Sequence, residues 1–208
     1  MANIIFDFDG TLADTLHIAV SLFRKFAQKS HPTDDAEIER LRGLSAREVV
    51  KSLGIPWWRL PYFVYEGRKA VQQQMGSVKA IAGIEPVVHE LHEKEHKLFI
   101  LSSNSTENIA KFLDNNKLRR YFDGFWGGQG IFAKSAALKK IVRKNSFNLE
   151  DCVYIGDEVR DVEAARHAGM KCIAVSWGYN NRKALKAANP PVLVDNPKEL
   201  LGFLKAYR

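Results

Sequence analysis

Short apolar segments alternate with longer amphipathic segments over most of the chain. The first apolar run, at residues 3–6, ends at an acidic, glycine-containing turn, which is typical of a central strand. From residue 81 onward, helical segments alternate with further apolar runs at 97–101, 125–126, 153–155, 172–175 and 192–194. Strands that alternate with helices of this length predict a parallel sheet covered by helices on both faces.

Residues 14–80 follow a different pattern, because they contain helical spacing and no strand-like run. Apolar residues repeat at helical spacing over 16–27, which predicts an amphipathic helix. Ser45 and Glu48 stand at the spacing of a capping box, so a second helix is expected to begin there. A third helix is predicted over 61–75.

These patterns together predict the fold class and the domain organisation. We expect an α/β protein with a doubly wound, Rossmann-like parallel sheet formed by residues 1–13 and 81–208. An all-helical domain is expected to be inserted at 14–80, after the first strand. A length of 208 residues suits one compact core that carries a smaller insert.

Composition and charge exclude several classes of protein. The chain is 46% hydrophobic and 26% charged, which excludes a disordered or fibrous protein. No apolar run approaches the roughly 20 residues that span a bilayer, and an acid at position 7 does not fit a secretory signal. We therefore expect a cytoplasmic protein without a membrane partner. The net charge of +7 is dispersed along the chain, which favours solvated helix faces over a nucleic-acid surface.

Polar residues follow the predicted strands, where an open parallel sheet binds its ligands. These segments supply Asp7 and Asp9, then Ser102, Ser103 and Asn104, then Asp157 and Asp161, while Lys134 opens a helix between the second and third groups. Each residue alone has an ordinary structural explanation in a turn or at a helix start. Their occurrence together, in this order and at strand ends, predicts a single site.

The residue types at this predicted site suit phosphoryl transfer. Converging carboxylates raise one another's pKa unless a cation neutralises them, and oxygen ligands beside a phosphate favour Mg²⁺ over Ca²⁺. A lysine and a hydroxyl can hold phosphoryl oxygens. One carboxylate can act as a nucleophile that forms an aspartyl-phosphate. A second carboxyl two residues on can protonate the leaving oxygen and later deprotonate water.

The same motifs resemble a known family. Residues 7–14, DFDGTLAD, resemble the first motif of the haloacid dehalogenase-like (HAD) superfamily, and Ser103–Asn104, Lys134 and residues 156–161, GDEVRD, resemble the second, third and fourth motifs. The insert at 14–80 is similar to the helical cap of many members. Residues 156–180 look most like phosphoglycolate phosphatase-type members.

The resemblance implies a role for each motif residue. It implies that Asp7 is the nucleophile and a magnesium ligand, and that Asp9 is the general acid/base and a ligand through its backbone carbonyl. Asp157 is implied to be a direct ligand of the metal. Asp161 is implied to be either a ligand or an acid that contacts the ligands without touching the metal. The phosphoryl group is expected to contact Ser103, Asn104 and Lys134, with Ser102 as the alternative to Ser103.

Arg42 and Gly43 precede the predicted capping box, where capped relatives place a specificity loop. An arginine there can bind a carboxylate or a second phosphate of the substrate. We therefore include Arg42 and Gly43 as possible specificity residues.

The resemblance implies a magnesium-dependent phosphatase that acts on a small phosphorylated metabolite, with phosphoglycolate as the best candidate. The dehalogenase branch lacks the second acid, so Asp9 favours phosphate-ester hydrolysis. A phosphosugar mutase and a nucleotide phosphatase of the same superfamily remain alternatives. A non-catalytic phosphate-binding or interaction module is an alternative of another class, although a binder needs no acid/base at position 9. The oligomeric state is left open.

Overall fold

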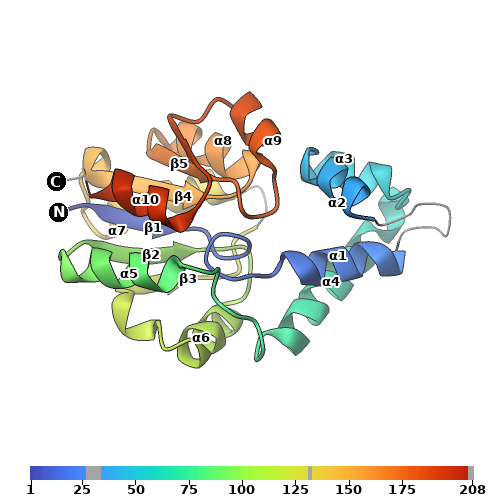
Figure 1. The fold of residues 1–208 in the computed structure, drawn as a ribbon, viewed down its shortest axis with the longest axis horizontal. Helices are drawn as coiled ribbons and strands as arrows, with labels where there is room; N and C mark the ends of the chain where they lie inside the picture. The colour runs from blue at the N-terminus through green and yellow to red at the C-terminus, as the bar shows by residue number, and fades with distance from the viewer. Residues whose placement is uncertain (27–33, 131–132, 206–208) are drawn as a thin grey trace.

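The computed structural model describes residues 1–26, 34–130 and 133–205, so part of the predicted insert, 27–33, lies outside the described residues. Its six strands form one parallel sheet in the order β3-β2-β1-β4-β5-β6 (Figure 1). They are β1 (Asn3–Phe6), β2 (Lys97–Leu101), β3 (Gly124–Trp126), β4 (Cys152–Gly156), β5 (Lys171–Val175) and β6 (Val192–Val194). The predicted α/β class and the parallel sheet are confirmed.

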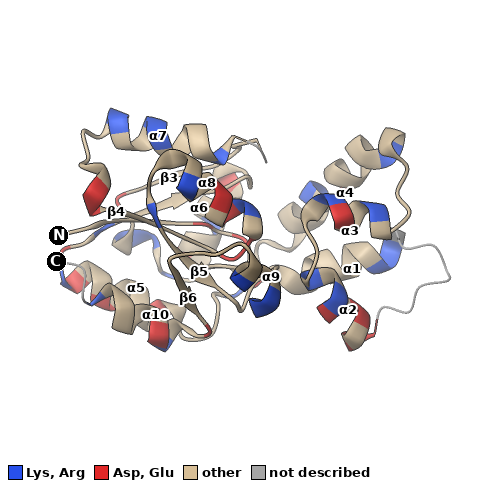
Figure 2. Cartoon of the chain, turned by 90° about the horizontal axis from the view of Figure 1, so that it is seen from above, with Lys and Arg blue, Asp and Glu red and all other residues tan. Residues whose placement is uncertain are grey.

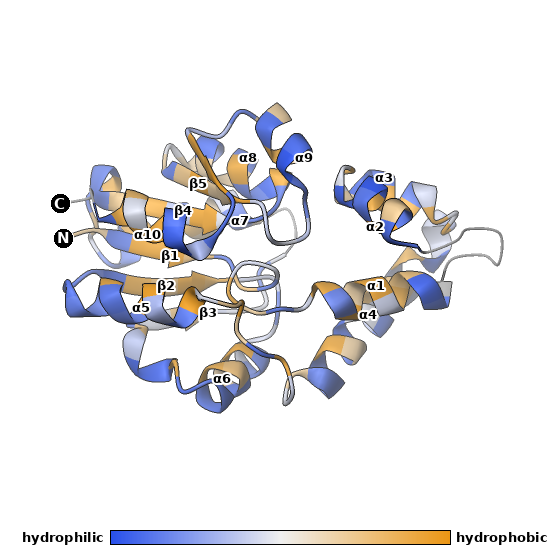
Figure 3. Cartoon of the chain, in the orientation of Figure 1, coloured by the Kyte–Doolittle hydropathy of each residue, from blue (hydrophilic) through white to orange (hydrophobic). Residues whose placement is uncertain are grey.

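Helices cover both faces of this sheet. They are α5 (Ile84–Glu93), α6 (Thr106–Asn115), α7 (Lys134–Lys144), α8 (Val159–Ala168), α9 (Arg182–Ala187) and α10 (Pro197–Leu204), with short 3₁₀ turns η2 (Arg119–Tyr121) and η3 (Leu149–Asp151). Ile4 and Phe6 of β1 pack into one buried cluster with α5 and α10, whereas Ile5 packs into a second cluster with α7 and α8. Because successive side chains of a strand point to opposite faces, one apolar run supplies both clusters. The apolar strands between more polar helices are visible in Figure 3.

In the described residues, the insert between β1 and α5 contains helices and no strand, and we call this insert the cap. It comprises α1 (Leu16–Phe26), α2 (Asp35–Arg42), α3 (Ala46–Ser52), η1 (Trp57–Arg59) and α4 (Leu60–Gln74). The predicted capping box is present, with Ser45 Oγ accepting from the Glu48 N–H and the Ser45 N–H donating to the Glu48 carboxylate. Helices α1 and α4 pack together, and the rings of Phe23 and Phe63 stack at a centroid distance of 6.4 Å.

The cap joins the core at the carboxyl ends of the strands (Figure 1). The two connecting segments run side by side, since the Asp14 N–H donates to the Lys79 carbonyl at 3.0 Å and the Ile81 N–H to the Leu12 carbonyl at 2.9 Å. The residues that directly follow β1, β2 and β4 therefore lie at the edge of the sheet that faces the cap (Figure 1).

Charged residues of both signs occur on helices of the core and of the cap (Figure 2). Lys and Arg are spread over helices of both the core and the cap, α7 and α9 among them (Figure 2). Among the described residues, no helix has the length and apolar content that crossing a membrane requires.

The turn after β1 depends on a buried aromatic pair. Phe8, between Asp7 and Asp9, meets Phe112 of α6 edge to face at 5.0 Å, and both rings are fully buried. We expect Phe112→Ala to lower the free energy of unfolding by about 3–5 kcal/mol, because it leaves a cavity against Phe8. Urea denaturation measures this change. The matched control Phe203→Ala, at a half-exposed ring, should change it by less than about 0.5 kcal/mol, and equal losses would contradict the prediction.

Candidate active site

A buried lysine lies between two aspartates at the centre of the site. Lys134, the first residue of α7, places Nζ 2.8 Å from Asp7 Oδ2 and 2.5 Å from Asp161 Oδ1. All three side chains are at most 3% exposed. The Tyr154 hydroxyl of β4 donates to Asp161 Oδ1 at 3.3 Å. Residues from β1, α7 and α8 that the sequence predicted for one site are thus in contact.

Burial and neighbouring charges set the protonation of this pair. Loss of water raises the pKa of Asp7 to about 7, while the charges of Lys134 and Arg160 oppose the rise. Burial by itself lowers the pKa of Lys134, but the carboxylates of Asp161 and Asp7 outweigh it and hold the pKa above its usual value. Lys134 is consequently a permanent cation beside an aspartate that titrates near neutral pH.

Asp9 is held by the side chain of Asn104, which precedes α6 and is itself bound by Asn108 of that helix. Asn104 Nδ2 lies 3.1 Å from each Asp9 carboxylate oxygen, and Asn104 Oδ1 accepts from Asn108 Nδ2 at 2.8 Å. Removal from bulk water raises the pKa of Asp9, against the hydrogen bonds from Asn104 and Thr15. A fixed carboxyl that retains its proton at higher pH suits a general acid. The Asn104 side chain is therefore engaged with Asp9, and the expected contact between Asn104 and phosphate stays a prediction.

The two serines after β2 differ in their environment. Ser102 is 1% exposed, and its Oγ accepts from the Asn104 N–H at 2.9 Å. Ser103 is half-buried, and its hydroxyl has no hydrogen-bond partner within the described parts of the chain. This difference favours Ser103 over Ser102 as the hydroxyl that would bind a phosphoryl oxygen, a role that stays a prediction.

Asp157 is enclosed between two loops of the core. Its Oδ1 accepts from Thr11 Oγ1 and its Oδ2 from the Tyr179 N–H, each at 2.6 Å. Gly10, at φ +77°, and Gly178 lie so close that a Cβ on either would overlap the Asp157 carboxylate. Burial, with the charges of neighbouring carboxylates, raises the pKa of Asp157 well above its usual value.

Carboxylate oxygens of Asp7, Glu158 and Asp161 approach within 4.8 Å of one another, which is close enough to share a metal ion. Together with Asp157 they make four carboxylates around two cationic side chains, Lys134 and Arg160. The excess of two negative charges, and a donor set made only of oxygen, fit a hard divalent cation. Glu158 was not expected in this group, and the predicted role of Asp157 as a ligand stays a prediction.

Arg160 is a second residue that the sequence reasoning missed. Its guanidinium pairs with Glu158, and its charge acts on Asp7. Its Nε atom is buried and has no hydrogen-bond partner within the described residues. Neither Glu158 nor Arg160 is distinguishable by type from surface residues of a helix start, so only their place inside the fourth motif could have indicated them.

Arg42 and Gly43 lie where the cap meets the core. Arg42 donates to the backbone carbonyl of Ser176 at 3.0 Å and to that of Gly178 at 3.0 and 3.2 Å, and it pairs with Glu39. Gly43 ends α2 with ordinary right-handed backbone angles. The predicted contact between Arg42 and substrate stays a prediction, because in this conformation the guanidinium binds the core.

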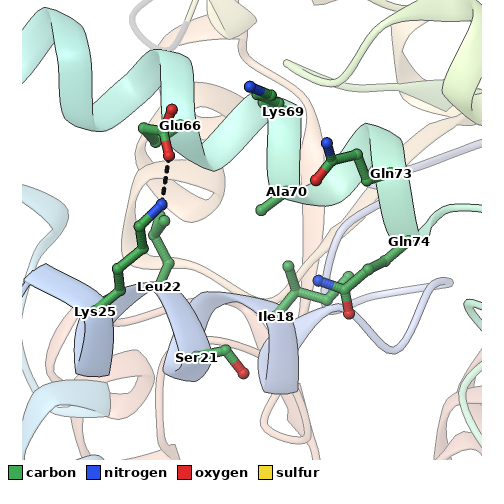
Figure 4. Close-up of a pocket in the computed structure, with 9 residues that line it drawn as sticks. All are labelled: Ile18, Ser21, Leu22, Lys25, Glu66, Lys69, Ala70, Gln73 and Gln74. Atoms are coloured by element: carbon green, nitrogen blue, oxygen red, sulfur yellow. Dashed lines mark hydrogen bonds and ion pairs between the residues drawn. The ribbon is translucent and has the colours of Figure 1, made fainter.

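A separate hollow of about 270 Å³ lies within the cap, between α1 and α4 (Figure 4). Lys25 of α1 and Glu66 of α4 form an ion pair across it at 2.6 Å. None of the residues predicted for the site lines this hollow. It is therefore a feature of cap packing, distinct from the carboxylate site.

Known proteins are similar to this chain in sequence and in fold. A protein-family model described as haloacid dehalogenase-like hydrolase matches residues 4–175. A phosphoglycolate phosphatase from Synechococcus elongatus is 35% identical over 203 residues, covering 97% of this chain and 96% of that protein. A phosphoglycolate phosphatase from Pseudomonas fluorescens is 27% identical, covering 95% and 78%. A haloacid dehalogenase-like family hydrolase from Streptococcus pneumoniae has a similar fold, with a TM-score of 0.78, 21% identity and 98% of each chain covered.

The pKa of Asp7 predicts how cation binding depends on pH. A proton on Asp7 competes with a metal ion, so binding is strong above pH 7 and weakens below it. With a pKa of about 7, Asp7 alone should make the affinity for Mg²⁺ fall about tenfold between pH 8 and pH 6, as measured by isothermal titration calorimetry. Asp7→Asn should bind more weakly and lose this tenfold contribution to the pH dependence. Equal or tighter binding by the wild type at pH 6 would contradict the assignment.

Proposed function

The chain is a phosphatase of the haloacid dehalogenase-like hydrolase family, and we propose that it uses Mg²⁺ and hydrolyses a small phosphate monoester through an aspartyl-phosphate. The contact of Lys134 with Asp7, beside an Asp9 held by Asn104, carries the proposal. Phosphoglycolate is the best candidate substrate, because the relative from Synechococcus elongatus that bears this name matches nearly the whole chain.

The first half of the reaction forms a bond between Asp7 and phosphorus. Asp7 Oδ attacks the phosphorus atom while Asp9 donates its proton to the ester oxygen, which leaves as an alcohol. Lys134, and the Ser103 hydroxyl on the opposite loop, bind the phosphoryl oxygens. The raised pKa of Asp9 suits this step, because the acid must be protonated when the alcohol leaves.

The second half returns the enzyme to its starting state. Asp9, now ionised, accepts a proton from a water molecule, whose oxygen attacks the phosphorus and releases Asp7 and inorganic phosphate. Asn104 holds the Asp9 carboxylate in both halves, so the same oxygen atoms can serve the alcohol and the water. A magnesium ion bound by Asp7, Glu158, Asp161 and Asp157 would neutralise charge on the phosphoryl oxygens.

Phosphate release with and without magnesium tests the reaction class. Wild-type protein should release phosphate from a generic aryl phosphate only when Mg²⁺ is present, and a chelator should abolish the release. Asp7→Asn should lower kcat by at least about 10³-fold, because it removes the nucleophile, and Asp9→Asn by about 10²–10⁴-fold. Asp114→Asn, at an exposed aspartate that pairs with Arg119, is the matched control and should retain full activity. Turnover by Asp7→Asn at the wild-type rate would overturn the proposal.

Substrate selectivity is tested at Arg160. Phosphoglycolate carries a carboxylate besides its phosphate, and the unpartnered Nε of Arg160 is a donor for such a group. Arg160→Gln should raise the KM for phosphoglycolate at least about tenfold more than the KM for an aryl phosphate, consistent with a charge-assisted hydrogen bond of about 1.5–3 kcal/mol. Arg166→Gln, on the same helix but exposed, is the control. Equal changes in the KM of both substrates would contradict a contact between Arg160 and the carboxylate.

A separate test addresses the alternative of a mutase. If a sugar phosphate were converted to its isomer without release of phosphate, the enzyme would be a mutase.

A further inference from the structure

Asn180, in the loop after β5, contacts the cap and the core at the same time. The residue is 6% exposed. Its Nδ2 donates to the carbonyls of Arg42 and Leu44 in the cap, each at 2.9 Å. Its Oδ1 accepts from the N–H of Val159, at the start of α8, at 2.9 Å. One buried amide thus satisfies backbone groups of two segments that are more than 100 residues apart in sequence.

On the core side, the same loop holds the segment that carries Asp157 and Glu158. The Asn180 N–H donates to the Asp157 carbonyl at 3.2 Å, and the Tyr179 N–H donates to the Asp157 carboxylate at 2.6 Å. Val159, bound by the Asn180 side chain, directly follows Glu158. A shift of the loop therefore moves or frees two of the four carboxylates of the site.

On the cap side, the end of α2 and the loop bind each other in both directions. Arg42 donates to the carbonyls of Ser176 and Gly178, and the Arg42 carbonyl accepts from Asn180 Nδ2 and from the Asn181 N–H at 3.0 Å. If the cap moved away, two donors of the Asn180 amide and the carbonyls of the loop would lose their partners together. Each of these hydrogen bonds favours the docked cap, and they form or break together, so the cap and the loop favour one joint arrangement.

We propose that Asn180 is a positioning residue that couples docking of the cap to the order of the Asp157–Val159 segment, and through it to cation binding. The link to a cation rests on the proposed function, whereas the coupling between cap and core does not. Because coupling between two equilibria is reciprocal, a bound cation also favours the docked cap. Removal of a residue that holds a metal ligand in place typically lowers the metal affinity by about 10–100-fold.

Three variants separate this coupling from a merely structural role. Asn180→Ala removes the amide, and Arg42→Ala removes the guanidinium from the cap side without touching α8. The matched control is Asn181→Ser. Asn181 also binds the cap, through Glu39, and its Oδ1 caps α9, but no hydrogen bond of its side chain in the described chain reaches Asp157 or α8. A serine at this position can still cap α9 but cannot make the contact with Glu39.

Calorimetric titration with Mg²⁺ alone gives the first readout. We expect Asn180→Ala to weaken Mg²⁺ binding at least about tenfold and Arg42→Ala about three- to tenfold, while Asn181→Ser stays within about twofold of the wild type. Wild-type affinity in Asn180→Ala, or an equal loss in Asn181→Ser, would overturn the proposal.

Amide hydrogen exchange without metal gives the second readout. Arg42→Ala should speed exchange of the Val159 and Tyr179 amides, in the core, at least about tenfold, although neither amide contacts Arg42. Unchanged exchange at both amides would overturn the coupling. If the wild type bound no Mg²⁺, the proposed function would fail, and exchange would still decide the coupling. If Asn180→Ala did not fold, Arg42→Ala would carry both measurements.

Discussion

The buried contact of Lys134 with Asp7 and Asp161 is the interaction on which the rest of the site depends. Two carboxylates and an ammonium group at most 3% exposed lose nearly all of their hydration, so each is stable there only because the others are present. The contact needs β1, α7 and α8 in fixed relative positions. Helices α7 and α8 share one buried cluster with β1 and β4, which fixes those positions independently of the charges. The apolar core thus provides the free energy that holds the charged centre together.

The site holds more carboxylates than cationic side chains, and this excess of negative charge suits catalysis better than it suits the stability of the fold. Asp157 and Glu158 add two carboxylates to the balanced part of the cluster, and burial raises the pKa of Asp157 well above its usual value. Such a site would gain stability by binding a divalent cation, and in the proposed reaction its positive groups would bind phosphoryl oxygens. Gly10 and Gly178 make this possible sterically, because a side chain at either position would occupy the space of the Asp157 carboxylate.

Local sequence patterns predicted the parts of this molecule that depend on local physics. The apolar run at 3–6 became β1, and the Ser45 capping box started α3, since both are determined by a few adjacent residues. The gathering of Asp7, Lys134 and Asp161 followed from parallel topology, which brings strand ends to one edge. The six-residue helix α9 has too few residues for a periodic pattern and was not predicted. The support of Asp9 by Asn108 through Asn104 was also missed, because its geometry depends on how α6 packs.

Arg42 shows most clearly where sequence reasoning ends. Its position before a capping box fits a loop that touches substrate, and the charge alone suits an anion. In the folded chain its guanidinium binds carbonyls 134 and 136 residues away, in a loop with no charged residue, and its contact with substrate stays a prediction. That loop also donates to Asp157. Motion of the cap and order of the carboxylates therefore depend on the same hydrogen bonds, so an anion that competed for Arg42 would also loosen the loop beside Asp157. In the coupling that we propose, docking of the cap and order of the site are linked by this shared set of donors and acceptors.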